Sequence, residues 1–179
     1  MPHCLVIVPV PEVEPYVSRL RDLYDPAARR GLGAHITLLH TPLPVGGVGT
    51  ALLAALGKLG SMASAFAYTI ARTGRFPSTL FLAAEPVGPF QWLNEQLLQA
   101  ASDSSARSFV PHVSVVRGGA MRERAHEVEQ ELTLMLAHRG PIPCMCSGIE
   151  LLEDSTGVWR GVRRFALSGG TGSPSPMPS

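Results

Sequence analysis

The chain has 179 residues, of which 45% are hydrophobic, and its formal net charge at pH 7 is +1. This length and composition suffice for the core of one domain or of two tightly packed lobes, and they exclude wholesale disorder. The small net charge excludes the broad basic face with which proteins grip duplex DNA, but one or two arginines in a cleft suffice for a small anionic substrate.

The cysteines and the apolar segments bear on metal content and location. Cys4, Cys144 and Cys146 are odd in number, and no second close pair of Cys or His completes a zinc site. The apolar run 5–10 follows no basic region and is cut by Pro9, so it does not predict a signal peptide. No stretch reaches the roughly 20 apolar residues that span a membrane. We therefore expect a cytoplasmic protein with reduced thiols, no membrane contact, no metal and no cofactor.

In chain order, the hydrophobic patterns predict strands and helices that alternate. In the first helix, Val13, Val17 and Leu20 fall at helical spacing, and Asp25-Pro26 ends it. The expected elements are strand 4–8, helix 12–24, loop 29–33, strand 34–39, helix 48–59, strand 66–72, hairpin loop 73–78, strand 79–84, helix 89–101, strand 111–116, helix 121–137, and strands 142–152 and 158–167. Residues 169–179 are Gly, Ser, Thr, Pro and one Met, which predicts a flexible tail.

The order of these elements repeats along the chain. Each half has a helix, a loop and a short strand that opens with a histidine, His35 or His112, and then a helix and two more strands. Repeated units usually fold alike, so the two histidine strands are expected at equivalent places of two lobes.

Each histidine strand carries a hydroxyl residue two positions after the histidine. The two strings are His35-Ile36-Thr37 and His112-Val113-Ser114. Side chains at i and i+2 of a strand share a face, so each histidine lies beside its hydroxyl while the apolar residue between them faces the core. The polar face must then meet water or a ligand, because an unpaired buried polar group is costly.

This pair of motifs suits the opening of a cyclic phosphodiester. In-line attack needs a base that deprotonates water and an acid, on the other side of phosphorus, that protonates the departing ribose oxygen. Imidazoles titrate near neutral pH, so one can be neutral while the other is protonated. The hydroxyls can donate to the non-bridging oxygens, where negative charge concentrates in the transition state. No metal is required by this scheme.

The strings 34–39 and 110–117 resemble the paired signatures of the two-histidine (2H) phosphoesterase superfamily, which includes bacterial 2′-5′ RNA ligase-like proteins and cyclic nucleotide phosphodiesterases. Phe76-Pro77 with the strand that follows resembles the mid-chain hairpin of the family, and 149–154 with Trp159 and 165–167 resembles its last two strands. The resemblance covers roughly residues 3–168.

The resemblance implies an α+β, bilobal fold over 1–168, with two antiparallel sheets facing a central cleft, helices outside and a pseudo-twofold duplication. It implies hydrolysis of 2′,3′-cyclic or related cyclic phosphates, and reversible 2′-5′ ligation in some members. The expected partner is a small nucleotide or an RNA end, not duplex DNA; the sequence indicates no oligomeric state. His35 and His112 would be the acid/base pair, in an order that the sequence leaves open, and Thr37 and Ser114 would hold the phosphate.

Further residues have two interpretations each. Arg117, three residues past Ser114, can clamp a phosphate or be a solvated strand-end arginine. Phe76 and Trp159 can stack on a base of the substrate, or be rim or core aromatics. His40 lies at odd spacing from His35, so on a continuing strand it faces away from the cleft and is interpreted as structural.

Two classes of rival function remain. A zinc hydrolase would carry a pattern such as His-Glu-x-x-His, and a histidine-triad hydrolase would carry His-x-His-x-His; the sequence has neither. A non-catalytic protein that binds RNA ends or nucleotides on the same fold is the other alternative, and it would have no need of both histidines.

Overall fold

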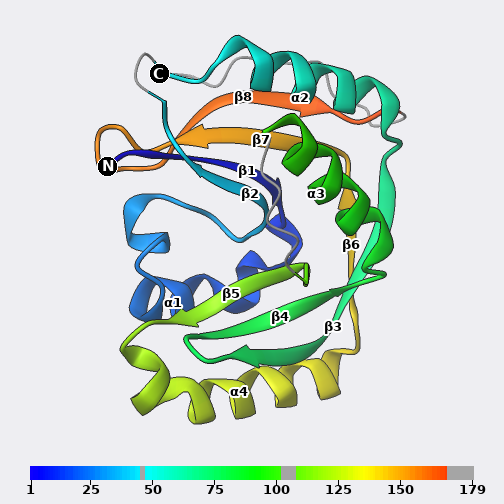
Figure 1. The fold of residues 1–179 in the computed structure, drawn as a ribbon. Helices are drawn as coiled ribbons and strands as arrows, with labels where there is room; N and C mark the ends of the chain where they lie inside the picture. The colour runs from blue at the N-terminus through cyan, green and yellow to red at the C-terminus, as the bar shows by residue number, and fades with distance from the viewer. Residues whose placement is uncertain (45–46, 102–107, 169–179) are drawn as a thin grey trace.

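One curved sheet of eight antiparallel strands organises the computed structural model, which describes residues 1–44, 47–101 and 108–168 (Figure 1). The strand order is β6-β3-β4-β5-β2-β1-β7-β8. The strands are β1 (His3–Pro9), β2 (His35–Pro42), β3 (Phe66–Phe76), β4 (Thr79–Glu85), β5 (His112–Arg117), β6 (Ile142–Cys146), β7 (Gly148–Glu153) and β8 (Arg160–Ala166).

The sheet consists of two four-stranded halves that meet between β5 and β2. Among the described residues a single pair, Ile36 with Val113, joins β2 to β5, whereas the strands within each half pair over most of their length. The predicted α+β fold with two antiparallel sheets is therefore confirmed, with the addition that the sheets are continuous through this one pair. We call this junction of β2 and β5 the seam.

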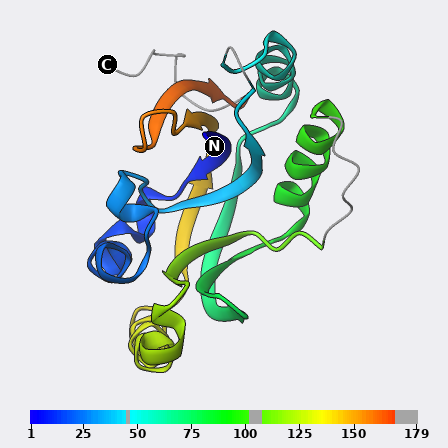
Figure 2. The same cartoon turned by 60° about the vertical axis from the view of Figure 1, so that its left-hand side comes forward.

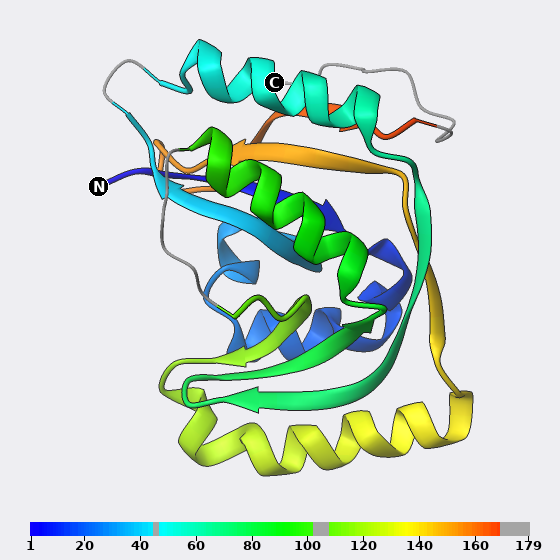
Figure 3. The same ribbon diagram turned by 45° about the vertical axis from the view of Figure 1, so that its right-hand side comes forward.

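In the described part of the chain, four α-helices and two short 3₁₀ helices complete the fold. They are α1 (Glu14–Tyr24), α2 (Thr50–Met62), α3 (Gly88–Ala100), α4 (Ala120–Arg139), η1 (Pro11–Val13) and η2 (Ala28–Arg30). Helices α1 and α4 contact β5, while α3 contacts β2 and α2 contacts β8. Figures 2 and 3 show α2 and α3 toward one end of the molecule and α4 toward the other. The predicted repeat is present along the chain as helix, histidine strand, helix and two strands, first α1-β2-α2-β3-β4 and then α3-β5-α4-β6-β7.

The main core lies between the sheet and the helices on its outer face. Alternate residues of the strands, such as Val6, Ile36 and Val113, are fully buried against apolar helix residues such as Leu56 and Leu132. The alternation in the sequence produces this face because successive side chains of a strand point to opposite sides. No helix among the described residues combines the length and apolarity that a membrane crossing requires.

Two predicted boundaries are wrong, those of strand 142–152 and of hairpin loop 73–78. The expected strand 142–152 is two strands, because β6 pairs with β3 and β7 pairs with β1, and the chain passes from one half of the sheet to the other at Ser147. Ser147-Gly148 interrupts the apolar run at this point and is the sequence signal of the break. The expected tail 169–179 lies outside the described residues.

The expected hairpin loop 73–78 is mostly strand, because β3 continues to Phe76 and only Pro77-Ser78 form the turn. Gly74 suggested a loop, but it lies opposite Phe81, where a Cβ atom would come within 2.5 Å of the phenyl ring. Glycine is required at this strand position because a larger side chain would collide with the ring of Phe81.

The seam gives a prediction for stability. Ile36 is 0% exposed, so Ile36→Ala leaves a cavity where the two halves meet. We expect a loss of about 2–5 kcal/mol in the free energy of unfolding, measured in urea, and about 0.5–1.5 kcal/mol for the control Ile36→Val. Equal small losses for both variants would contradict a closed seam.

Candidate active site

The two motifs meet across the seam. Both histidines open their strands, and the antiparallel pairing of Ile36 with Val113 sets His35 beside Ser114 and Thr37 beside His112. The histidines are thus diagonal neighbours on one face, with an expected Cα separation of roughly 7–8 Å. The pairing brings the four predicted catalytic residues together.

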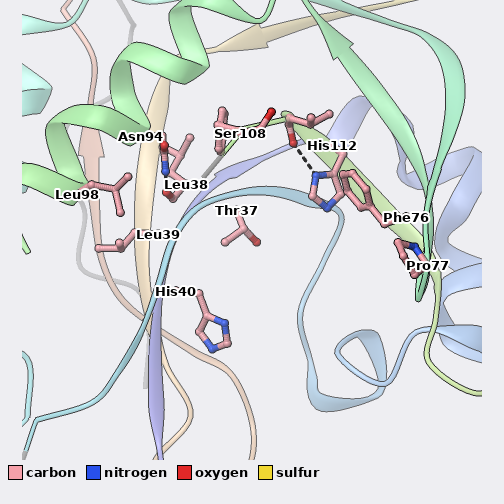
Figure 4. A pocket seen from close by; sticks show the side chains of 12 residues that line it. Thr37, Leu38, Leu39, His40, Phe76, Pro77, Asn94, Leu98, Ser108 and His112 are labelled. Carbon is pink, nitrogen blue, oxygen red and sulfur yellow. Dashed lines mark hydrogen bonds between the residues drawn. The ribbon is translucent and has the colours of Figure 1, made fainter. Parts of the chain in front are cut away.

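Both imidazoles are oriented in the same way. Nδ1 of His35 lies 2.7 Å from the carbonyl oxygen of Gly33, and Nδ1 of His112 lies 2.7 Å from that of Val110 (Figure 4). A carbonyl oxygen only accepts, so each Nδ1 carries the proton and donates it. In each neutral ring Nε2 is then the unprotonated nitrogen, which can act as a base or receive a proton.

Burial lowers the pKa of both rings. His35 is 8% exposed, and its desolvation lowers its pKa to about 4, although the hydrogen bond to Gly33 opposes this shift. Desolvation also lowers the pKa of His112, and the nearby charge of Arg117 lowers it further. Both imidazoles are consequently neutral at pH 7 in the free protein.

A cavity of about 670 Å³ opens beside the seam, a volume that suits a small-molecule ligand (Figure 4). Thr37 and His112 line it, and Leu39, Leu98 and Phe109 give it an apolar wall. Its other lining residues are Leu38, His40, Phe76, Pro77, Asn94, Ser108 and Val110. His35, Ser114, Arg117 and Trp159 do not line this cavity.

Phe76 lies at the His112 end of the cavity. Its ring meets the His112 ring edge to face at 5.1 Å, and the Phe81 ring at 4.5 Å. The ring of Phe76 is 36% exposed, so it retains a surface that a ligand can contact. This placement excludes a core aromatic and fits both the binding and the rim interpretation of Phe76.

Arg117 lies on the same face of the sheet as the histidines and hydroxyls of the two motifs. It pairs with Thr79 on β4, while Ser114 pairs with Phe81, because the register shifts by one residue between them. Its positive charge lowers the pKa of His35, His40 and His112. Its guanidinium lies 4.0 Å from the buried carboxylate of Asp25.

Trp159 occupies a different place from the one expected. It packs against a small second core of Leu5, Ile7, Leu32 and Leu152, and the guanidinium of Arg30 lies over its ring at 5.4 Å. This placement favours the alternative interpretation, a packed aromatic.

The prediction that His40 faces away from the cleft is wrong. His40 pairs with Leu5 of β1 and Thr37 pairs with Ile7, so both lie on the same face, and His40 lines the cavity. Simple alternation fails because β2 contains a bulge at Leu38, which adds one residue between Thr37 and Leu39.

A buried ionic cluster behind the site was missed by the sequence analysis. Arg21, 2% exposed, donates to Asp25 at 3.1 Å and to the carbonyl of Leu32 at 2.9 Å. Glu14 accepts from the backbone N–H of Ala34. The cluster holds the segment that leads into His35. The cluster could have been found from the sequence, because Arg21 lies on the apolar stripe of helix 12–24, four residues after Val17.

Among the described residues, no group of three or more His, Cys, Asp or Glu side chains is placed to hold a metal ion.

Comparisons with known proteins agree with this geometry. The TT0787 structure of Thermus thermophilus matches with a TM-score of 0.64 and 19% identity, over 93% of this chain and 98% of that one. E. coli LigT complexed with 3′-AMP matches with a TM-score of 0.62 and 18% identity, over 94% and 99%. LigT complexed with NADP+ matches with a TM-score of 0.56 and 20% identity, over 92% and 96%. A comparison with curated proteins finds no match.

A duplicated sheet with a histidine-hydroxyl motif on each side of its seam defines a two-histidine phosphoesterase fold. The family model described as the 2′-5′ RNA ligase superfamily matches residues 9–157, and the chain belongs to that superfamily.

The burial of His35 predicts a pH dependence of stability. Its pKa is about 4 when folded against 6.5 for the ordinary ring, so the unfolded chain binds the proton first as pH falls. The resulting loss in the free energy of unfolding is absent above pH 6.5, grows as pH falls and reaches about 3 kcal/mol below pH 4.

The measurement compares urea unfolding of the wild type and His35→Asn at pH 7 and pH 4. His35→Asn lacks the titrating ring, so wild type should lose about 3 kcal/mol relative to it over this range. A difference between the two proteins that stays constant with pH would contradict the burial of a neutral His35.

Proposed function

We propose that this protein is a metal-independent phosphodiesterase that opens 2′,3′-cyclic or related cyclic phosphate esters by general acid/base catalysis between His35 and His112. The observation that supports this most directly is the antiparallel pairing at the seam, which sets both histidines and both hydroxyls on one face beside the cavity.

The chemistry needs a proton moved at each side of phosphorus. The unprotonated Nε2 of one histidine takes a proton from water as its oxygen forms the new bond to phosphorus. The other histidine, protonated, gives its Nε2 proton to the ribose oxygen as that bond breaks, which leaves a phosphomonoester and a free hydroxyl. If a ribose 5′-hydroxyl replaces water, the same steps form a 2′-5′ phosphodiester, and they are reversible.

The neighbouring donors suit the charge that develops on phosphorus. Thr37 and Ser114 lie beside the histidines of the opposite motif, so each can donate to a non-bridging oxygen. Arg117 supplies a positive charge that acts on both rings. Its guanidinium lies 4.0 Å from the carboxylate of Asp25.

The cavity suits a nucleotide. Its apolar wall of Leu39, Leu98 and Phe109 and the exposed ring of Phe76 can cover a nucleobase next to the phosphate site. LigT has been solved with 3′-AMP and with NADP+, which supports a small nucleotide or RNA end as the ligand. The three buried, free thiols suit the reducing cytoplasm, where we place the protein.

The test of catalysis replaces each histidine. His35→Gln and His112→Gln should each lower kcat for a nucleoside 2′,3′-cyclic phosphate by about 10²–10⁴-fold, because each removes one proton transfer. Both variants should still bind a nucleoside 2′-monophosphate in calorimetry. His138→Ala, on the exposed face of α4, is the matched control and should act as wild type.

The assay is run in excess chelator and is also the test against the rival functions. Wild-type turnover that disappears with chelator would contradict metal independence. Turnover that survives either glutamine substitution would contradict the assignment, and a wild type that binds without turnover would favour the non-catalytic alternative.

The lowered pKa of both histidines predicts how the rate depends on pH. Both imidazoles are neutral in the free protein, yet the reaction needs one of them to be protonated. A bound phosphate anion favours the protonated form of a nearby imidazole. We expect a bell-shaped profile of kcat near neutrality and a kcat/KM optimum at lower pH, because kcat/KM reports the free protein. Identical optima in a full pH series would contradict this proton uptake on binding.

A further inference from the structure

The two histidine strands share a second feature besides their motifs. On β2, Thr37 pairs with Ile7 and Leu39 with Val6, which leaves Leu38 without a partner. On β5, Ser114 pairs with Phe81 and the next paired residue is Val116, so Val115 is also left out. Each strand therefore has a bulge immediately after its catalytic hydroxyl residue.

A bulge adds one residue to one strand, so residues beyond it change face. The residue three positions past each hydroxyl is thereby returned to the face of the motif. On β5 this residue is Arg117, and on β2 it is His40. His40 and Arg117 consequently occupy equivalent positions in the two halves, and the full patterns are His-x-Thr-x-x-His and His-x-Ser-x-x-Arg.

The bulge on β2 is held from outside the sheet. Asn94 of α3 donates from its side-chain amide to the carbonyl oxygen of Leu38 at 2.7 Å. Leu38 has no partner on β1, so the amide of Asn94 supplies its carbonyl oxygen with a hydrogen-bond donor that the strand pairing does not supply. Asn94 and His40 both line the cavity, and Figure 4 shows Thr37 and His40 along the bend of β2.

The surroundings of His40 favour an anion. Its exposed ring lies 4.9 Å from the ring of His3, and desolvation, His3 and Arg117 lower its pKa while Asp154 raises it. The carboxylate of Asp154 is already paired with Arg30 at 2.5 Å. A ligand that reaches His40 therefore meets imidazole donors and the field of Arg117.

We propose that His40 is a substrate-binding residue that recognises a second anionic group, the phosphate on the 5′ side of the nucleotide whose cyclic phosphate lies at the seam. This assignment rests on the proposed function. Arg117 serves the reacting phosphate, while His40 lies farther along β2, roughly 7 Å past Thr37, because the bulge sets the two residues opposite Leu5 and Ile7, two positions apart on β1. This is the length scale of one nucleotide. Asn94 is a positioning residue that acts by holding the bulge at Leu38.

The experiment compares adenosine 2′,3′-cyclic phosphate with its 5′-phosphorylated form. Wild type should prefer the 5′-phosphorylated substrate by about tenfold in kcat/KM, mainly through KM, the size expected for a hydrogen bond to a charged group. His40→Ala should reduce this ratio to near one. His40→Arg, which copies Arg117, should keep or raise it, and His138→Ala should leave it at the wild-type value.

Asn94→Leu tests the bulge at nearly constant side-chain size. It removes the donor to Leu38, so the substrate ratio should fall toward one as in His40→Ala. An equal loss of kcat/KM on both substrates, with the ratio kept, would contradict the positioning role.

A wild type with no preference, or a preference that His40→Ala retains, would overturn the proposal for His40. If wild type opens neither substrate, the proposed function fails, but His40 is still decided by calorimetry with 3′-AMP and adenosine 3′,5′-bisphosphate. The bisphosphate should then bind about tenfold more tightly to wild type and equally to His40→Ala. Equal binding of both ligands to wild type in calorimetry would also overturn the proposal for His40.

Discussion

The site depends on one backbone pairing, that of Ile36 with Val113. Because this is the sole paired position between β2 and β5 among the described residues, the register there fixes which side chains of the two motifs are neighbours. A shift by one residue would turn one motif into the core and bring two apolar side chains to the cavity. The full burial of both residues makes that shift costly, since it would expose them and bury a histidine and a hydroxyl.

The second constraint is electrostatic. Rings that are buried enough to exclude water lose their protons, and the arginine that attracts a phosphate lowers the pKa of the same rings. A phosphate anion relieves both effects, because its charge offsets that of Arg117 and favours a proton on one imidazole. The buried pair of Arg21 and Asp25 places one charge of each sign behind His35, and their opposed effects on its pKa leave desolvation as the largest cause.

The sequence was sufficient for much of this account. Alternation in the two motifs correctly predicted that each histidine shares a face with its hydroxyl, and the repeated order of elements predicted two equivalent halves. It could not predict the bulges, because Leu38 and Val115 are apolar residues in apolar runs and nothing local marks them as unpaired. His40 was placed on the wrong face for this reason. The dipeptide Ser147-Gly148 marks the break between β6 and β7, but which strand each of them pairs with, like the packing of Trp159, depends on contacts between distant segments that single-sequence patterns do not contain.

The most direct test of the central claim, that the two imidazoles act together on one phosphate, is a double-mutant cycle on kcat with His35→Gln, His112→Gln and the double variant. Groups that act as a unit are strongly non-additive, so the double variant should be about as slow as either single variant. Losses that multiply in the double variant, as for two independent residues, would contradict the account.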